Sequence, residues 1–109
     1  MSNVLKLVLT DHWFEEIKSG RKTHEYRKAT LFWKKRLCDI ERLTDKIIGY
    51  SFKPYTLVQF QKAYRKNPER MTFEIKKIDW LPIGLKTDLH CQESVFDIEL
   101  GERVDVAED

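Results

Sequence analysis

Short segments in which apolar and polar residues alternate constrain the fold of this chain more than any other feature. An alternating segment places its apolar side chains on one face, which is the period of a half-buried β-strand. No apolar run exceeds three residues, so neither a membrane span nor a secretory leader is expected. The segments with an apolar face are Val4–Leu9, Leu57–Gln61, Met71–Lys76 and Val95–Leu100. The pattern of the third slips at Lys76 and Lys77 and resumes with Ile78 and Trp80, which indicates a β-bulge.

Two further segments have the spacing of amphipathic helices. Trp13, Phe14 and Ile17 form one apolar stripe after Thr10 and Asp11, and Gly20 suits the left-handed position that ends a helix. The second helix is predicted over Thr30–Leu43, with Trp33, Leu37 and Ile40 at i, i+4 and i+7. Asn67 and Pro68 mark a turn between two of the strands.

The resulting order of elements is β-α-β-α-β-β-β. Two helices cannot cover both faces of a five-stranded parallel sheet, so a doubly wound fold is disfavoured. The sequence therefore predicts a small α+β domain around a curved or closed sheet.

One predicted strand, Lys22–Lys28, has no apolar face. Period two places Thr23, Glu25 and Arg27 on one side, and burial of such charges is tolerated only when they are paired and hydrogen-bonded. Two interpretations stay open. The strand lines a polar pocket, or it is an exposed edge strand whose charges prevent aggregation.

Charge is distributed unevenly along the chain. Residues 1–77 carry 18 of the 20 basic residues and 9 of the 18 acidic ones, whereas residues 78–109 carry the other 2 and 9. The basic part suits a phosphate-bearing partner, although the two halves could also neutralise each other.

The two cysteines, Cys38 and Cys91, cannot form a disulfide framework, which favours reduced thiols in a cytoplasmic protein. The histidines and cysteines lack the spacing of a zinc site, and no metal or cofactor is expected.

The sequence Ser-Gly-Arg-Lys-Thr-His-Glu-Tyr-Arg at residues 19–27, after a strand and a helix with Trp and Phe, resembles the signature of the ASCH domain. This is the activating-signal-cointegrator homology domain, a relative of the PUA barrels. The resemblance extends to a short bacterial and phage-type subgroup of that family and covers residues 1–101, leaving residues 102–109 as an acidic C-terminal tail. The segments that carry it further are Phe32–Leu37, Val58–Tyr64, Phe73–Ile75 and Val95–Gly101.

The resemblance implies a small PUA-like β-barrel of about five strands with two helices, and a cleft beside Lys22–Arg27. It also implies recognition of RNA or a nucleotide. One branch of the family removes the acyl group from N4-acetylcytidine with a lysine, a threonine and a glutamate, and another is described as cleaving RNA. Lys22 matches the catalytic lysine by its place after Gly20 and Arg21, and Glu25 stands where that branch has its threonine.

Binding of RNA or a nucleotide is the function that these residues favour. Cations can contact phosphates, aromatic rings can stack on unpaired bases, and Glu25 can accept a hydrogen bond from an exocyclic amine. The candidate nucleic-acid-binding residues are Lys22, Thr23, Glu25, Tyr26, Arg27, Lys28, Lys34, Lys35 and Tyr64.

Two other functions remain open. As an amidohydrolase on an N4-acylated cytidine-type nucleoside, the protein would use Lys22 to stabilise the oxyanion and Glu25 to activate water. A ribonuclease is a related possibility. As a protein–protein interaction module, it would present its basic helix to an acidic partner.

Overall fold

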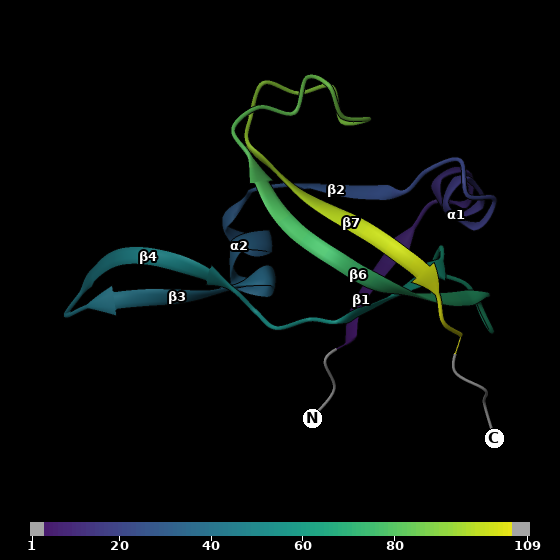
Figure 1. The fold of residues 1–109 in the computed structure, drawn as a ribbon, viewed down its shortest axis with the longest axis horizontal. Helices are drawn as coiled ribbons and strands as arrows, with labels where there is room; N and C mark the ends of the chain where they lie inside the picture. The colour runs from purple at the N-terminus through teal and green to yellow at the C-terminus, as the bar shows by residue number, and fades with distance from the viewer. Residues whose placement is uncertain (1–3, 106–109) are drawn as a thin grey trace. The chain divides into compact units, whose positions relative to one another are not determined.

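The computed structural model describes residues 4–105, with nine helices and strands (Figure 1). In chain order they are β1 (Val4–Leu9), α1 (Asp11–Lys18), β2 (His24–Lys28), α2 (Leu31–Leu37), β3 (Cys38–Leu43), β4 (Lys46–Phe52), β5 (Leu57–Lys62), β6 (Arg70–Leu81) and β7 (Val95–Arg103).

The described residues fall into two compact units. The first comprises the chain up to Glu25, Tyr55–Lys77 and the chain from Ile98, and the second comprises Tyr26–Pro54 and Ile78–Asp97. Five strands share one mixed sheet in the order β1-β5-β6-β7-β2, and β3 and β4 form a separate two-stranded sheet. The five strands of the larger sheet are the five that the sequence predicted. The small α+β fold with two helices is thus confirmed, and it is consistent with a small PUA-like barrel.

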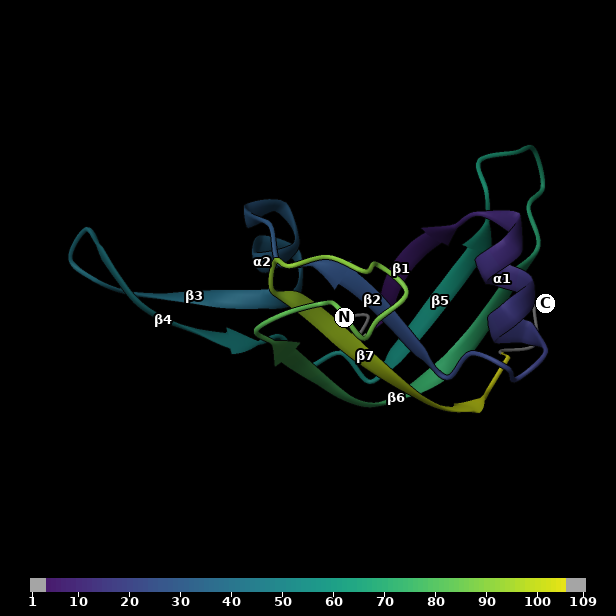
Figure 2. The same cartoon turned by 90° about the horizontal axis from the view of Figure 1, so that it is seen from above.

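The two-stranded β3–β4 sheet belongs to the second unit and follows α2 directly (Figure 2). The prediction of one helix over Thr30–Leu43 is wrong, because α2 ends at Leu37 and the chain continues as β3. Cys38 and Ile40 alternate with acidic neighbours, and this strand period overlaps the helical spacing. The backbone N–H of Lys53 donates to the Leu37 carbonyl at 2.8 Å, which ties the end of β4 to the end of α2.

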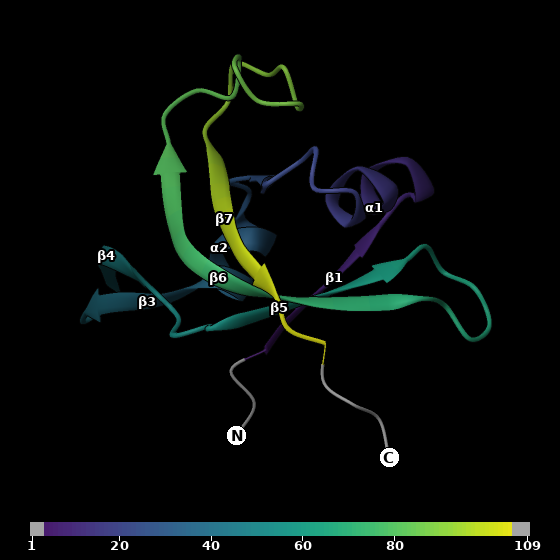
Figure 3. The same cartoon turned by 45° about the vertical axis from the view of Figure 1, so that its right-hand side comes forward.

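The core of the first unit lies between α1 and the strands β1 and β5, and Figure 3 shows α1 beside β1. β1 and β5 pair in parallel, with Leu7 opposite Phe60. The apolar side chains of the alternating segments are the buried ones, since the side chains on one face of each strand are almost fully covered. The buried side chains of these three elements are Leu5, Leu7, Leu9, Phe14, Ile17, Val58 and Phe60.

β6 and β7 extend beyond the ends that the sequence predicted for them. β6 is continuous from Arg70 to Leu81 and passes through the exposed pair Lys76 and Lys77. β7 continues to Arg103, two residues into the segment assigned to the acidic tail. Asp105 in that segment accepts a hydrogen bond from the Thr72 backbone N–H at 2.9 Å. Residues 106–109 of the tail lie outside the described residues.

Candidate functional site

The residues proposed from the sequence are divided between the two units, and each group has its own surroundings. Lys22, Thr23, Glu25 and Tyr64 belong to the first unit. The remaining candidates belong to the second unit and are Tyr26, Arg27, Lys28, Lys34 and Lys35.

In the first unit, Lys22 and Glu25 form a buried ion pair. The Lys22 Nζ lies 2.8 Å from the Glu25 Oε1, and the two side chains are 11% and 4% exposed. The ammonium also lies 4.2 Å from the centroid of the Trp13 ring, close enough for a cation–π contact. The Lys22 ammonium, from the loop between α1 and β2, thus contacts both the Glu25 carboxylate of β2 and the Trp13 indole of α1.

The local sequence explains why Lys22 turns inward. Gly20 has a φ of +85°, a left-handed conformation that glycine adopts at low cost, and it ends α1. The backbone N–H of Lys22 then donates to the Glu16 carbonyl at 3.1 Å, which holds the chain against the last turn of the helix. Arg21, between them, pairs instead with the Glu16 carboxylate at the surface.

The edge position that one interpretation gave the polar strand is confirmed, and the polar pocket of the other stays a prediction. β2 is the last strand in the order of the five-stranded sheet, so it is an edge strand. Glu25 is nevertheless buried, whereas Thr23 on the same side of the strand is exposed. The edge position and the inward carboxylate are compatible because the Lys22 ammonium pairs with that carboxylate.

In the second unit, basic side chains lie over aromatic rings. The Arg27 Cζ is 5.2 Å and the Arg36 Cζ is 5.7 Å from the centroid of the Trp33 ring. The Lys34 Nζ is 5.5 Å from the centroid of Tyr50. We call these five residues the cation–ring cluster. The Thr30 hydroxyl accepts from the Trp33 backbone N–H at 3.4 Å and so caps the helix that carries three of them.

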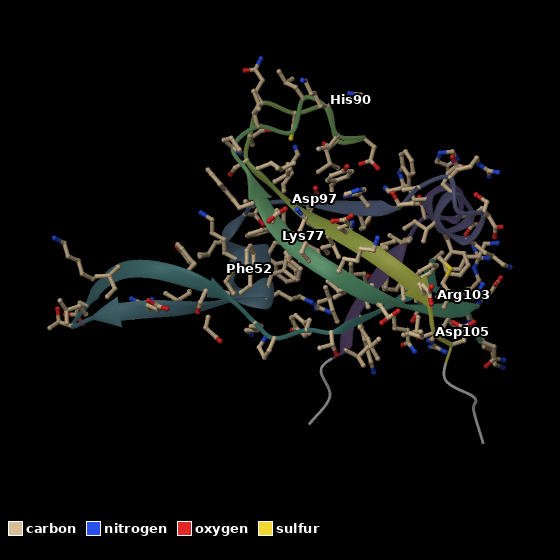
Figure 4. All side chains as sticks on the ribbon, viewed as in Figure 1. Phe52, Lys77, His90, Asp97, Arg103 and Asp105 are labelled. Atoms are coloured by element: carbon tan, nitrogen blue, oxygen red, sulfur yellow. The ribbon has the colours of Figure 1, made fainter. Side chains whose placement is uncertain are left out.

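A pocket of about 340 Å³ lies beside Lys34. Phe52, one of its walls, is seen at the end of β4 next to α2 in Figure 4. Its ring contacts Phe96 edge to face, with centroids 5.9 Å apart. We call this cavity the aromatic pocket, and its described lining residues, all in the second unit, are Lys34, Cys38, Tyr50, Phe52, Trp80 and Phe96.

The thiol in this pocket is poorly disposed to ionise. Burial, and next the negative charge of Asp39, raise the pKa of the Cys38 thiol above its usual value. Since the thiolate is the reactive form, Cys38 has the character of a small apolar wall residue. Cys38 and Cys91 are both buried free thiols.

Sequence reasoning missed most of the aromatic pocket. Of its walls only Lys34 was proposed as a binding residue, whereas Trp80 and Phe96 were read only as parts of alternating strands. The period-two spacing of Ile48, Tyr50 and Phe52 is a strand signal that could have revealed β4. The joint arrangement of walls from α2, β3, β4, β6 and β7 has no counterpart in local sequence.

Other candidates lie at the surface. Tyr64 is 87% exposed, and Lys35 is exposed on α2. The Lys28 ammonium is 4.0 Å from the Glu93 carboxylate, and both side chains are largely in solvent. Exposed groups of this kind can contact a ligand without rearrangement, but they do not form an enclosed site.

Two further properties of the described chain bear on its function. Residues 4–105 contain no group of three or more His, Cys, Asp or Glu side chains placed to hold a metal ion. No helix within this range is long and apolar enough to cross a membrane.

In comparisons with known proteins, no family model, no curated protein and no solved structure matches this chain.

Proposed function

We propose that this protein binds single-stranded RNA or a nucleotide, with the cation–ring cluster of the second unit as its main contact. The single observation that carries the proposal is the placement of Arg27, Arg36 and Lys34 over the rings of Trp33 and Tyr50. The resemblance of residues 19–27 to the ASCH signature supports the same conclusion.

The physical argument combines two kinds of contact. Arginine and lysine neutralise phosphates and release counterions, a term that does not depend on base sequence. Aromatic rings offer stacking surfaces to bases, which are accessible only when the strand is unpaired. A surface where both occur within one helix and two strands therefore favours a single strand over a duplex.

The salt dependence of RNA binding tests this proposal. We expect wild-type protein to bind a single-stranded oligonucleotide with an affinity that falls steeply as salt rises, at a logarithmic slope of about −0.7 per phosphate contacted. Removing one cation of the cluster with Arg36→Gln should reduce that slope by about 0.7. Lys86→Gln, which removes an exposed charge of the second unit outside the cluster, is the matched control.

Three results would contradict the proposal. One is that wild-type protein binds no single-stranded RNA at low salt. Another is an affinity that does not change between low and physiological salt. The third is an equal effect of Arg36→Gln and Lys86→Gln on the slope, because the contact would then not lie on the cation–ring cluster. If this protein captures an unrelated acidic protein and the capture survives nuclease treatment, the result supports a protein–protein interaction module instead.

A second candidate function is favoured by the Lys22–Glu25 ion pair, because the two residues proposed as catalytic are in contact and shielded from water. In an amidohydrolase, Glu25 would take a proton from a water molecule while the oxygen of that water bonds to the acyl carbon. The Lys22 ammonium would stabilise the resulting oxyanion. The C–N bond then breaks, the amine leaves with that proton, and a carboxylic acid is released. Turnover of N4-acetylcytidine can be followed by absorbance.

The enzyme test changes the carboxylate of the ion pair. If the candidate is correct, wild-type protein hydrolyses the substrate, and Glu25→Gln reduces kcat because it removes the base. Glu16→Gln removes a half-buried carboxylate of α1 as the matched control. Absence of hydrolysis by wild-type protein would eliminate this candidate and leave the binding function untouched.

A further inference from the structure

The aromatic pocket has a composition that defines the chemistry of its ligand. Four of its six described walls are aromatic, and one, Lys34, is charged. We propose that this pocket holds one nucleoside monophosphate unit, with the base inserted between the rings and the phosphate at the Lys34 ammonium. This inference rests on the proposed function and names the ligand unit that occupies this part of the surface.

The shape and lining of the pocket favour a flat ring. Its volume of about 340 Å³ is in the range of small-ligand pockets, which are lined mainly by apolar and aromatic side chains. Trp80 and Tyr50 line the pocket and yet are 53% and 44% exposed, so their rings have surface that a ligand can cover. Covering aromatic surface by stacking is favourable for any base, because each base has a π-face.

The charge in the pocket favours an anionic ligand. A cage of aromatic rings by itself suits a cation such as a quaternary ammonium. Here the Lys34 Nζ already lies 5.5 Å from the centroid of Tyr50, so a cationic ligand would meet a like charge. A ligand with a neutral ring and an attached phosphate satisfies both the rings and the ammonium.

The pocket offers little means of reading base edges. Apart from Lys34, its polar side-chain groups are the Tyr50 hydroxyl, the Trp80 indole N–H and the Cys38 thiol. Stacking area therefore dominates over hydrogen-bond recognition, and a purine, with the larger ring, should bind more tightly than a pyrimidine. The same nucleotide unit can be free or part of an RNA strand, and the experiment separates these two sources.

The test is an NMR titration of the full chain, which reports weak binding and also shows whether each variant is folded. The ligands are adenosine 5′-monophosphate, uridine 5′-monophosphate, adenosine and a short oligoadenylate. We expect the adenine nucleotide to bind more tightly than the uracil nucleotide and than adenosine. Trp80→Ala should weaken binding of the adenine nucleotide by about tenfold or more. Lys34→Gln should bring the affinities for the nucleotide and for adenosine close to each other.

Control variants isolate the pocket from the rest of the second unit. Leu43→Ala removes an exposed apolar side chain of β3, and Lys86→Gln removes an exposed charge, and neither residue lines the pocket. Both should bind the adenine nucleotide as wild type does. If Trp80→Ala does not fold, Phe52→Leu removes a wall ring while keeping most of the side-chain volume, and the same loss is expected.

Each outcome has a defined meaning. If Trp80→Ala weakens oligoadenylate binding while the free nucleotide does not bind, the pocket takes its base from a strand, and the inference stands. If the free nucleotide binds as tightly as the oligomer, the inference stands with a free nucleotide as the ligand. If Trp80→Ala affects neither ligand, the pocket is not the site, although RNA binding by the cation–ring cluster survives. If wild-type protein binds neither ligand, the proposed function fails as well.

Discussion

Replacing Glu25 by glutamine leaves the Lys22 ammonium in a nearly dry site without the carboxylate that faces it. At 2.8 Å and an effective dielectric constant of about 20, the attraction between the two charges is about 6 kcal/mol. The desolvation of both charges offsets part of this attraction, and removing one partner of a buried pair costs about 3–5 kcal/mol. The glutamine carbonyl still accepts one hydrogen bond from Lys22, and 11% of the Lys22 side chain reaches water. We therefore expect a loss of about 2–3 kcal/mol in the free energy of unfolding.

The assay is urea unfolding at pH 7, followed by tryptophan fluorescence and circular dichroism. A loss of 2–3 kcal/mol is a large part of the stability of a domain of this size and corresponds to roughly 10–20 °C in Tm. The matched control is Glu16→Gln, because Glu16 makes an equally short pair with Arg21 at the surface, at 2.7 Å. Solvent screens that exposed pair, so this variant should unfold at nearly the wild-type urea concentration.

A second substitution tests the reason for the loss. Lys22→Met in the Glu25→Gln background removes the ammonium that has lost this carboxylate and should recover most of the stability, because an apolar replacement of a buried ion pair is often neutral or stabilising. The reasoning is refuted if Glu25→Gln and Glu16→Gln are equally mild. It is also refuted if Lys22→Met adds its own loss to that of Glu25→Gln, since loss of the carboxylate opposite the Lys22 charge would then not be the cause.

Three further predictions concern other parts of the molecule. Gly84→Ala should destabilise the protein by about 1–3 kcal/mol in urea unfolding, because the new Cβ would lie 2.7 Å from a side-chain carbon of β7, and an unchanged midpoint would contradict this contact. Hydrogen bonds from the Arg103 side chain and then from the Thr72 backbone N–H lower the pKa of Asp105 below its ordinary value of 3.8 (Figure 4). Its stabilising contribution is therefore present above that value and is lost as the pH falls through the lowered pKa, so wild type should lose more stability than Asp105→Asn on acidification below pH 3.8. The Cys38 thiol, whose pKa is raised by burial, should react with iodoacetamide at pH 7.5 much more slowly than a free cysteine, and reaction at the same rate in folded and urea-unfolded protein would disprove its burial.

The strands of the larger sheet were predictable because their signal is local. Side chains alternate between the faces of a strand, so the pattern of Val4–Leu9 or Val95–Leu100 already states which residues are buried. The end of α1 was predictable for the same reason, since Gly20 fits a left-handed position that most residues avoid.

The region around Cys38 shows where local signals become ambiguous. Trp33, Leu37 and Ile40 have helical spacing, but Cys38 and Ile40 also have strand spacing, and a short segment satisfies both periods. The chain takes the strand because β4 provides a partner with Cys38 opposite Phe52 and Ile40 opposite Tyr50. That choice depends on residues 10 to 14 positions away, which a periodicity window centred on the helix does not weigh.

The sequence by itself determined the strands of the larger sheet and the presence of two helices, because each follows from spacing along a few residues. It left open whether Glu25 points inward and which cation would neutralise it, and folding assigned Lys22 to it by closing the turn after α1. Only the tertiary structure assembled the aromatic pocket, whose walls are as far apart in the chain as Lys34 and Phe96. The walls of a pocket come from segments that are distant in the chain, and no local pattern of hydrophobicity encodes how close these segments lie in space.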